Sequence, residues 1–152
     1  MDLYAFLHER TTDILNEAQE ALDRARLQHY EEAGGEHVHQ RLRALLVLTT
    51  RAVKDRTLGP MVIHAEDVAR ERFVSGYDLW EVQTAFNVLE EAIWKRVISE
   101  LPSSEYASAL GLVSTVLGAG KDTLARRYVS LATKSRAPSL DMRSLFTGTE
   151  GT

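Results

Sequence analysis

The stretch ERFVSGYDLWEVQTAFNVLEEAIW, residues 71–94, decides the fold because it holds a helix stop, a helix start and a helical seam. Gly76 can adopt the left-handed conformation that closes a helix. Asp78 can cap the following helix, and Glu81, three residues later, completes a capping box. The stretch therefore predicts a tight corner between two helices.

Beyond this corner, apolar residues recur at alternating steps of three and four, which is the seam of a helical bundle. Phe86 lies on the seam and is expected in the core, whereas Trp80 and Trp94 lie off it and could fill a second interface. The seam residues are Leu79, Val82, Phe86, Leu89, Ile93 and Val97.

The same periodicity runs along most of the chain, so we expect an all-α fold with at least about 70% helix. The pattern predicts a bundle of about five helices, for which a globin-like arrangement is one option. Thr11, Thr12 and Asp13 could cap a fresh helix inside the first segment. The expected helical segments are roughly 2–31, 36–56, 60–74, 78–101 and 103–134.

The last helical segment is long and carries apolar residues in heptad register from Tyr106 to Leu131. Gly118 and Gly120 weaken it by about 1 kcal/mol each relative to alanine, which predicts either a kink or a close approach of another helix. We favour close approach. From Ser135 the composition becomes polar and glycine-rich, so residues 1–134 are predicted to form one domain and residues 135–152 a flexible tail, linker or docking peptide.

The amino-acid composition argues against several classes of function. A chain of 152 residues with 44% hydrophobic and 26% charged residues fits one globular domain. The net charge of −4 argues against a nucleic-acid binder or a protein drawn to anionic membranes. The absence of cysteine excludes disulfides, thiolate metal sites and a cysteine nucleophile. We expect a cytoplasmic protein, because neither an export signal nor a membrane-spanning run is present.

The apparent chemical motifs do not support catalysis or a cofactor. The stretch GAGKDT lacks the phosphate-loop pattern, because Thr115 stands where a glycine is needed and Asp122 where a hydroxyl residue is needed. No nucleophile elbow is present, and the five histidines form no converging metal-ligand set. His64 alone could face an apolar slot, as an axial haem ligand does.

Residues 69–97 resemble the central signature of the N-terminal domain of RsbT co-antagonist proteins of the RsbRD type. The resemblance implies a helical regulatory input domain, related in role to the non-haem globin-like sensors of stressosome proteins, and it carries no catalytic residues. A sulfate-transporter and anti-sigma-antagonist domain usually follows in that family, so the chain is expected to be a fragment or to act through its tail. The residues that carry the resemblance are Arg72, Gly76, Leu79, Val82, Ala85, Phe86 and Leu89.

The sequence thus predicts a non-enzymatic signalling module that acts through a protein partner and as a homodimer. The candidate ligand or partner surface lies at the corner and comprises Arg70, Arg72, Tyr77, Asp78 and Trp80.

The dimer is expected to form through the longest helices, at Val113, Leu117, Gly118 and Leu124. Two alternatives remain open. The chain could be a small-molecule or haem sensor in which His64 and aromatic residues line a cavity, or a purely structural dimerisation domain.

Overall fold

The computed structural model of the chain describes residues 2–136, and 90% of these residues are helical with no strand. The all-α prediction and the expected helix content are confirmed. The described part contains seven α-helices and one 3-10 turn, so the prediction of about five helices was wrong. They are α1 (Leu3–Glu9), α2 (Thr11–Ala25), α3 (Gln28–Ala33), α4 (Gly35–Asp55), α5 (Gly59–Val74), α6 (Leu79–Glu100), η1 (Ser103–Glu105) and α7 (Tyr106–Arg136).

The extra helices arise because the first expected segment breaks twice. At the first break Arg10 is the N-cap residue of α2 and makes no capping bond with its side chain. The Thr11 hydroxyl instead donates back to the carbonyls of Leu7 and His8, at 3.1 and 2.9 Å. These bonds satisfy the end of α1, so the expected cap at the start of α2 was wrong.

The second break lies at Arg26, which adopts the left-handed conformation with φ 50° and ψ 50°. This conformation is uncommon for a residue with a β-carbon, and no glycine marks the place in the sequence. The neighbouring Leu27 is buried. Packing of Leu27 into the core therefore accompanies the turn between α2 and α3.

The corner predicted between residues 76 and 81 is confirmed. Gly76 has φ 86°, and the N–H of Tyr77 donates to the carbonyl of Arg72 at 2.9 Å. Asp78 and Glu81 form the capping box of α6. Local residue chemistry is sufficient to end α5 and to begin α6 here.

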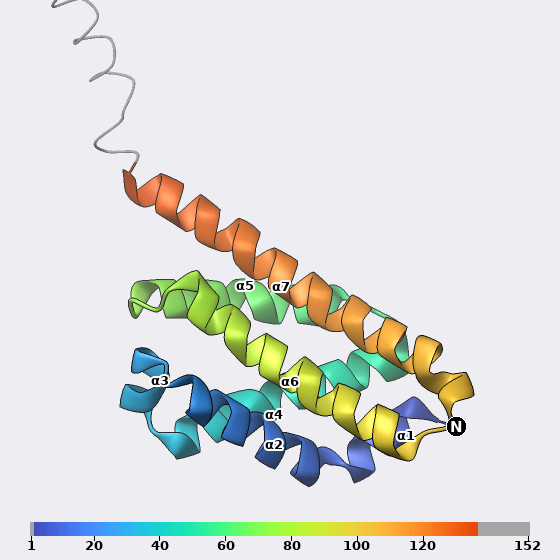
Figure 1. Cartoon of the computed structure of the whole chain (residues 1–152). Coiled ribbons are helices and arrows are strands. Elements are labelled where there is room, and N and C mark those ends of the chain that lie inside the picture. Colours follow the sequence, from blue (N-terminus) through green and yellow to red (C-terminus); the bar gives the residue numbers. More distant parts are fainter. Residues whose placement is uncertain (1, 137–152) are drawn as a thin grey trace, which may run out of the picture.

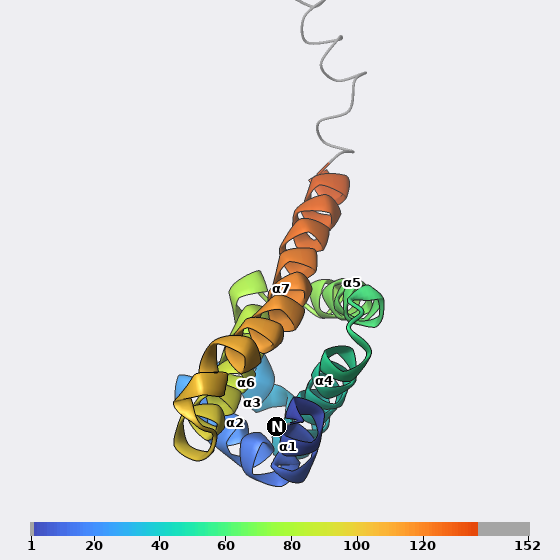
Figure 2. The ribbon, with the colours of Figure 1, turned by 90° about the vertical axis from the view of Figure 1, so that its right-hand side faces the viewer.

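The helices pack around one core, with α7 crossing one side of the bundle (Figure 1). α5 packs chiefly along α7, and α2 packs along α6 (Figure 2). Phe86 is buried as predicted, together with every other seam residue of α6 except the partly exposed Leu79. None of the described helices is long and apolar enough to span a membrane.

α7 is unbroken, and the close approach expected of its glycines occurs at Gly120 alone. A β-carbon on Gly120 would lie 2.7 Å from Cε2 of Phe86 and 3.0 Å from Sδ of Met61. Gly118 has no such neighbour within 4 Å. Three helices therefore meet at Gly120, while Gly118 lies on the open side of α7.

Candidate functional site

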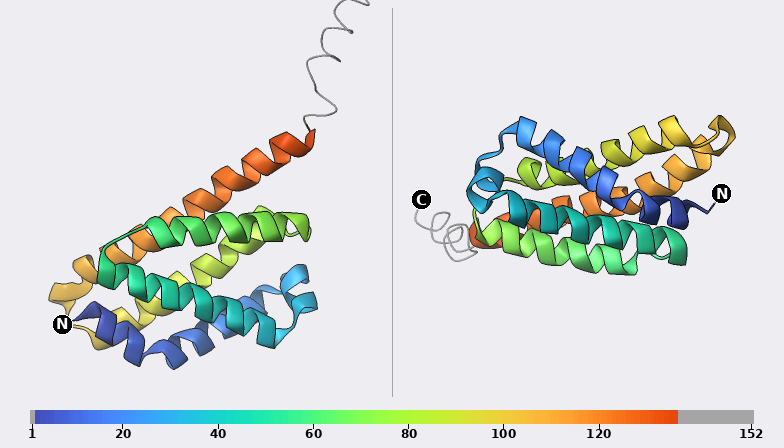
Figure 3. Two further views of the ribbon diagram at one scale, coloured as in Figure 1. Left: turned by 180° about the vertical axis from the view of Figure 1, so that it is seen from behind. Right: turned by 90° about the horizontal axis from the view of Figure 1, so that it is seen from below.

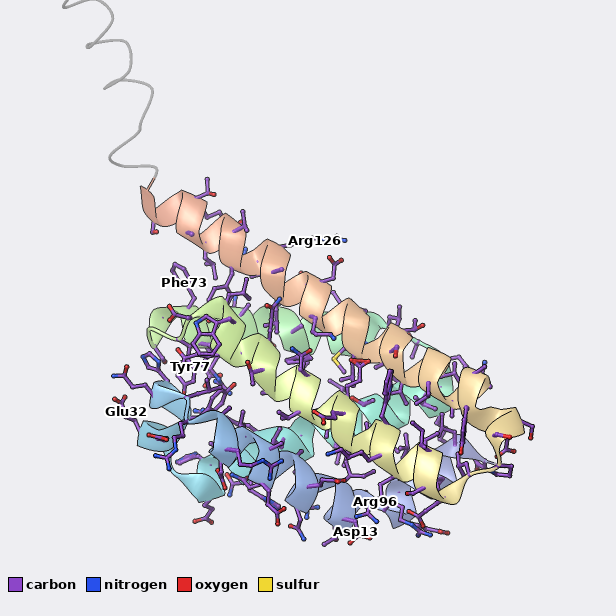
Figure 4. The ribbon with its side chains drawn as sticks, in the orientation of Figure 1. Asp13, Glu32, Phe73, Tyr77, Arg96 and Arg126 are labelled. Atoms are coloured by element: carbon purple, nitrogen blue, oxygen red, sulfur yellow. The ribbon has the colours of Figure 1, made fainter. Side chains whose placement is uncertain are left out.

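A set of buried and half-buried polar side chains gathers around Tyr77, at the end of the bundle where α5 turns into α6. Tyr77 is buried at this corner, against His29 and Tyr30 of α3, and Figure 4 shows it with Phe73 higher in that view. The set draws on helices far apart in the sequence, and we call it the Tyr77 cluster. Its members are His29 and Tyr30 of α3, Arg41 of α4, Arg72 of α5, Tyr77 of the corner, Glu81 of α6 and Tyr128 of α7.

Hydrogen bonds to Tyr77 connect the elements of this cluster. Nη1 of Arg41 donates to the Tyr77 hydroxyl at 2.8 Å, and this hydroxyl donates to the carbonyl of His29 at 3.3 Å. The hydroxyl of Tyr128 donates to the Tyr77 carbonyl at 3.0 Å. One tyrosine thereby joins α3, α4 and α7 to the corner.

The ring of Tyr77 is also enclosed by charge and by other rings. The guanidinium carbons of Arg41 and Arg72 lie 5.7 and 5.6 Å from its centroid, within the range of a cation–π contact. The His29 ring stacks on it at 4.8 Å, and Tyr30 meets it edge-on at 5.4 Å. Both arginines therefore make cation–π contacts with the same ring, that of Tyr77.

Glu81 anchors α3 to the beginning of α6. Its carboxylate accepts from the Asp78 N–H at 3.0 Å, from Nδ1 of His29 at 2.7 Å and from the His29 N–H at 3.3 Å. Burial alone would raise the pKa of Glu81, but these hydrogen bonds outweigh it and lower the pKa below its ordinary value. Glu81 is therefore an ionised, nearly buried anchor at neutral pH.

Arg72 is the most buried arginine among the described residues. Its side chain is 8% exposed, yet its one ion pair in the described part of the chain joins Nη1 to the 68% exposed Glu71, at 2.8 Å. A guanidinium carries five N–H donors. Arg72 thus has donor capacity that this single pair does not use.

A cavity of about 140 Å³ lies beside the cluster, between α4, α5 and α6. Most of its wall is apolar and includes Leu42 and Phe86. Its polar lining consists of Tyr30, Arg41, His64, Glu71 and Arg72, so we call it the Arg72 cavity.

Burial affects two of the polar groups that line this cavity. Burial, and secondarily Arg72, lowers the pKa of His64, which favours the neutral imidazole at pH 7. Burial raises the pKa of Tyr30 to about 12, so its hydroxyl stays protonated. Both groups can donate a hydrogen bond into the cavity at neutral pH.

The structure brings together three of the five residues predicted for the surface at the corner. Arg72, Tyr77 and Asp78 lie in or beside the Tyr77 cluster, where they are linked mainly to one another and to other helices. Arg70 and Trp80 point to solvent, with Arg70 paired to the exposed Asp67 at 2.7 Å and Trp80 58% exposed. The predicted group therefore divides into a buried part and an exposed part.

Sequence reasoning missed the cluster members that other helices supply. His29, Tyr30, Arg41 and Tyr128 stand in ordinary helical patterns, and nothing local in the sequence indicates their meeting. Glu81 was recognised only as a helix cap. Its capping role is confirmed, and its bonds to His29 add a second role.

The residues predicted for the dimer interface fall into a buried group and one accessible residue. Val113, Leu117 and Leu124 have no exposed surface, because the heptad seam of α7 packs inside the described bundle. In this conformation they offer nothing to a second copy, and their assignment to a dimer interface needs correction. Gly118 alone of the four lies toward open space.

The described residues contain no group of three or more histidines and carboxylates that could hold a metal ion. His37 is exposed and His39 half-exposed at the beginning of α4. Within the same residues, no serine or threonine hydroxyl is bonded to a histidine ring. The polar groups at the corner instead connect helices.

The described residues thus form an all-α bundle with a buried polar cluster and an adjoining cavity. The family model described as "RsbT co-antagonist protein rsbRD N-terminal domain" matches residues 7–141, and the chain belongs to this family. The match confirms the resemblance carried by residues 69–97. No significant match was found among curated proteins or among solved structures.

Proposed function

We propose that the chain is a non-enzymatic regulatory input domain of the cytoplasm that passes a signal to another protein. Its family is one of regulatory signalling domains. The observation that carries the proposal is the bond from Tyr128 to the Tyr77 carbonyl, because it ties the cluster to α7. A change in the cluster thereby reaches the helix that leads out of the bundle.

The course of α7 supports this route for the signal. Its described C-terminal end rises away from the other helices (Figures 1 and 3). Val129, directly after Tyr128, is 64% exposed. Ser135 and Arg136 belong to α7, and the rest of the expected tail or docking peptide, with Leu140, Met142, Leu145 and Phe146, lies outside the described residues and remains a prediction. Likewise, the division into a domain at 1–134 and a tail at 135–152 remains part of this proposal.

The homodimer is also part of the proposal, now through the open face of α7. Residues spaced by three and four form this face, and a β-carbon added at Gly111 or Gly118 would meet no atom within 4 Å. Small residues allow a second helix to approach closely, and two-fold pairing is the commonest closed arrangement. The open face of α7 comprises Gly111, Thr115, Gly118, Asp122 and Val129.

A signalling partner would use exposed groups near the corner. Arg70 and Trp80 are accessible there, and Val74 at the end of α5 is 79% exposed. Tryptophan and arginine are enriched at protein–protein interfaces relative to the rest of the surface. Arg70 and Trp80 keep the role of partner surface that the sequence suggested, and Val74 extends this surface.

Sedimentation equilibrium at micromolar concentration tests the dimer. We expect the unmodified chain to be dimeric and Gly118→Arg to be monomeric with an unchanged helical spectrum. The matched control is Asn16→Arg on α2, which adds the same exposed arginine away from α7 and should stay dimeric. A monomeric unmodified chain would remove the dimer from the proposal.

A second candidate function is a small-molecule or haem sensor, favoured by the position of His64 and Phe86 on the wall of the Arg72 cavity. The cavity volume of about 140 Å³ suits a small ligand, since pockets for drug-sized molecules usually exceed about 300 Å³. The globin-like arrangement remains a prediction. A haem is at least as large as a drug-sized molecule, so the cavity in this conformation does not fit one, and a Soret band in the purified protein would contradict this.

A further inference from the structure

We propose that the Arg72 cavity binds a small organic monocarboxylate, with Arg72 and Arg41 holding the carboxylate and the apolar wall holding its hydrocarbon part. This inference rests on the second candidate function, a small-molecule sensor, and deepens it; it needs neither a dimer nor a partner protein. It names the chemical class of a ligand for a site inside the bundle.

The size of the cavity restricts the ligand. Its volume is about 140 Å³, and an apolar cavity of about 150 Å³ in another protein holds benzene. A carboxylic acid of about four to seven carbon atoms therefore fits. Phe86, Leu42 and Val82 belong to the wall and suit a short aliphatic chain or one aromatic ring.

The state of Arg72 explains why an anion is favoured. Its side chain is 8% exposed, and its one ion-pair partner in the described chain, Glu71, is 68% exposed. No nitrogen of Arg72 is both buried and without a partner, so the donors that Glu71 does not use are reached by solvent, and a carboxylate can accept two parallel hydrogen bonds from them. An entering carboxylate would use donors that Glu71 leaves free.

The other polar groups at the cavity favour the same ligand class. Arg41 supplies a second positive charge, and Glu71 is the one carboxylate that lines the cavity. Tyr30 and His64 offer neutral donors at pH 7. The lining disfavours cations, and its apolar wall disfavours anions without a hydrocarbon part.

The position of the two arginines would let ligand binding affect contacts elsewhere in the bundle. Both guanidinium groups lie over the Tyr77 ring. The carbonyl of that tyrosine accepts the bond from Tyr128 of α7. A carboxylate that draws Arg41 and Arg72 into the cavity therefore acts on the residue that holds α7.

Calorimetric and NMR titrations test the site with defined probes. Butyrate and benzoate are compared with butyramide and benzamide, which match them in shape without the charge. We expect both carboxylates to bind at millimolar concentration or below and to shift the amide signals of Arg72, Ala85 and Phe86. Each amide should bind at least about tenfold more weakly, because charge-assisted hydrogen bonds are lost.

Three variants assign the binding to this cavity. Arg72→Gln should weaken benzoate binding by at least about tenfold, while Arg70→Gln, an exposed arginine of the same helix, should leave it unchanged. Ala85→Leu places a larger side chain in the cavity wall and should abolish binding. If Arg72→Gln fails to fold, Ala85→Leu and Arg41→Gln decide the question.

Three results would overturn the proposal: no binding of either carboxylate at millimolar concentration, equal binding of carboxylates and amides, or undiminished binding by Ala85→Leu. None of these results bears on the sedimentation of the unmodified chain. Failure of the ligand site and failure of the dimer are therefore distinguishable.

Discussion

Glu81 shows how one residue can serve two levels of structure. Its carboxylate caps α6 through the Asp78 N–H, and it also holds α3 through the ring and the N–H of His29. The first bond is local, whereas the others join residues 52 positions apart in the sequence. A charged anchor of this kind makes the corner sensitive to acid.

Replacing Glu81 by glutamine should remove this anchor. The pKa of Glu81 in the folded chain lies below its ordinary value of 4.5, so its stabilising contribution is present above pH 4.5 and is lost as the pH falls through the folded pKa. We expect Glu81→Gln to lower the free energy of unfolding at pH 7 by about 1–3 kcal/mol. Below pH 4.5, the free energy of unfolding of this variant should fall less steeply with pH than that of the unmodified protein. Urea denaturation between pH 7 and pH 3 measures both effects.

The matched control is Glu91→Gln on the same helix. Glu91 is 62% exposed and pairs with Lys95 one turn away, so its loss should change stability by less than about 0.5 kcal/mol. If Glu81→Gln followed the unmodified protein at every pH, the ionised anchor would be ruled out.

Single residues also show where sequence reasoning succeeds. The corner at Gly76 and Asp78 was predictable, because the positive φ of a glycine and the capping box are properties of adjacent residues. The left-handed Arg26 and Arg56 were not predictable. Both are C-cap residues of helices, where the left-handed conformation is common, but glycine or asparagine usually marks such a position in a sequence and arginine does not.

At the scale of elements, α7 has two different sides that the heptad pattern alone does not distinguish. The pattern correctly indicated a buried seam, with Val113, Leu117 and Leu124 on it. It did not indicate whether the seam packs against the same chain or a second copy, because both would look alike in the sequence. In the structure, helices of the same chain cover it.

The two central glycines of α7 provide a test of this difference, because the same substitution should have opposite effects. Gly120→Ala places a methyl group against Phe86 and Met61 and should destabilise the protein by about 1–2 kcal/mol. At concentrations low enough for the chain to be monomeric, a methyl group on Gly118 meets open space, and Gly118→Ala should stabilise the monomer by about 0.5–1 kcal/mol through helix propensity. Chemical denaturation of both variants gives the comparison.

A loss of stability in both variants would mean that α7 is confined on both sides, and a gain in both would mean that Gly120 is not a close contact. The Gly120 variant has a further consequence. Phe86 also lines the Arg72 cavity, so a ring displaced by the new methyl group would take space from a ligand there.

At the scale of the whole molecule, the Tyr77 cluster exists only because the fold brings distant residues together. The bond from Arg41 to Tyr77 spans 36 positions in the sequence, and the bond from Tyr128 to Tyr77 spans 51. The sequence identified the corner that contributes Arg72 and Tyr77. It could not identify the residues from α3, α4 and α7, because their meeting depends on how the helices pack.

α7 is fastened near its two ends by tyrosine hydroxyls that donate to backbone carbonyls. Tyr128 bonds to the carbonyl of Tyr77 at 3.0 Å, and Tyr106 bonds to the carbonyl of Ile98 at 2.7 Å. The first bond is buried and reaches the cluster, whereas the second is exposed and reaches the end of α6. Removing each of these two hydrogen bonds in turn distinguishes the loss of a local contact from the loss of coupling between the Tyr77 cluster and α7.

Tyr128→Phe and Tyr106→Phe each remove one such bond and keep the ring. We expect Tyr128→Phe to lower the free energy of unfolding by about 0.5–1.5 kcal/mol, and Tyr106→Phe by less because its bond is exposed. Hydrogen exchange should become faster in Tyr128→Phe both in the last turns of α7 and at the start of α6, since the cluster couples them. In Tyr106→Phe the faster exchange should stay near η1 and the end of α6. Exchange that changed only within α7 of Tyr128→Phe would show that the cluster and the outgoing helix are uncoupled, and the proposed route of the signal would fail.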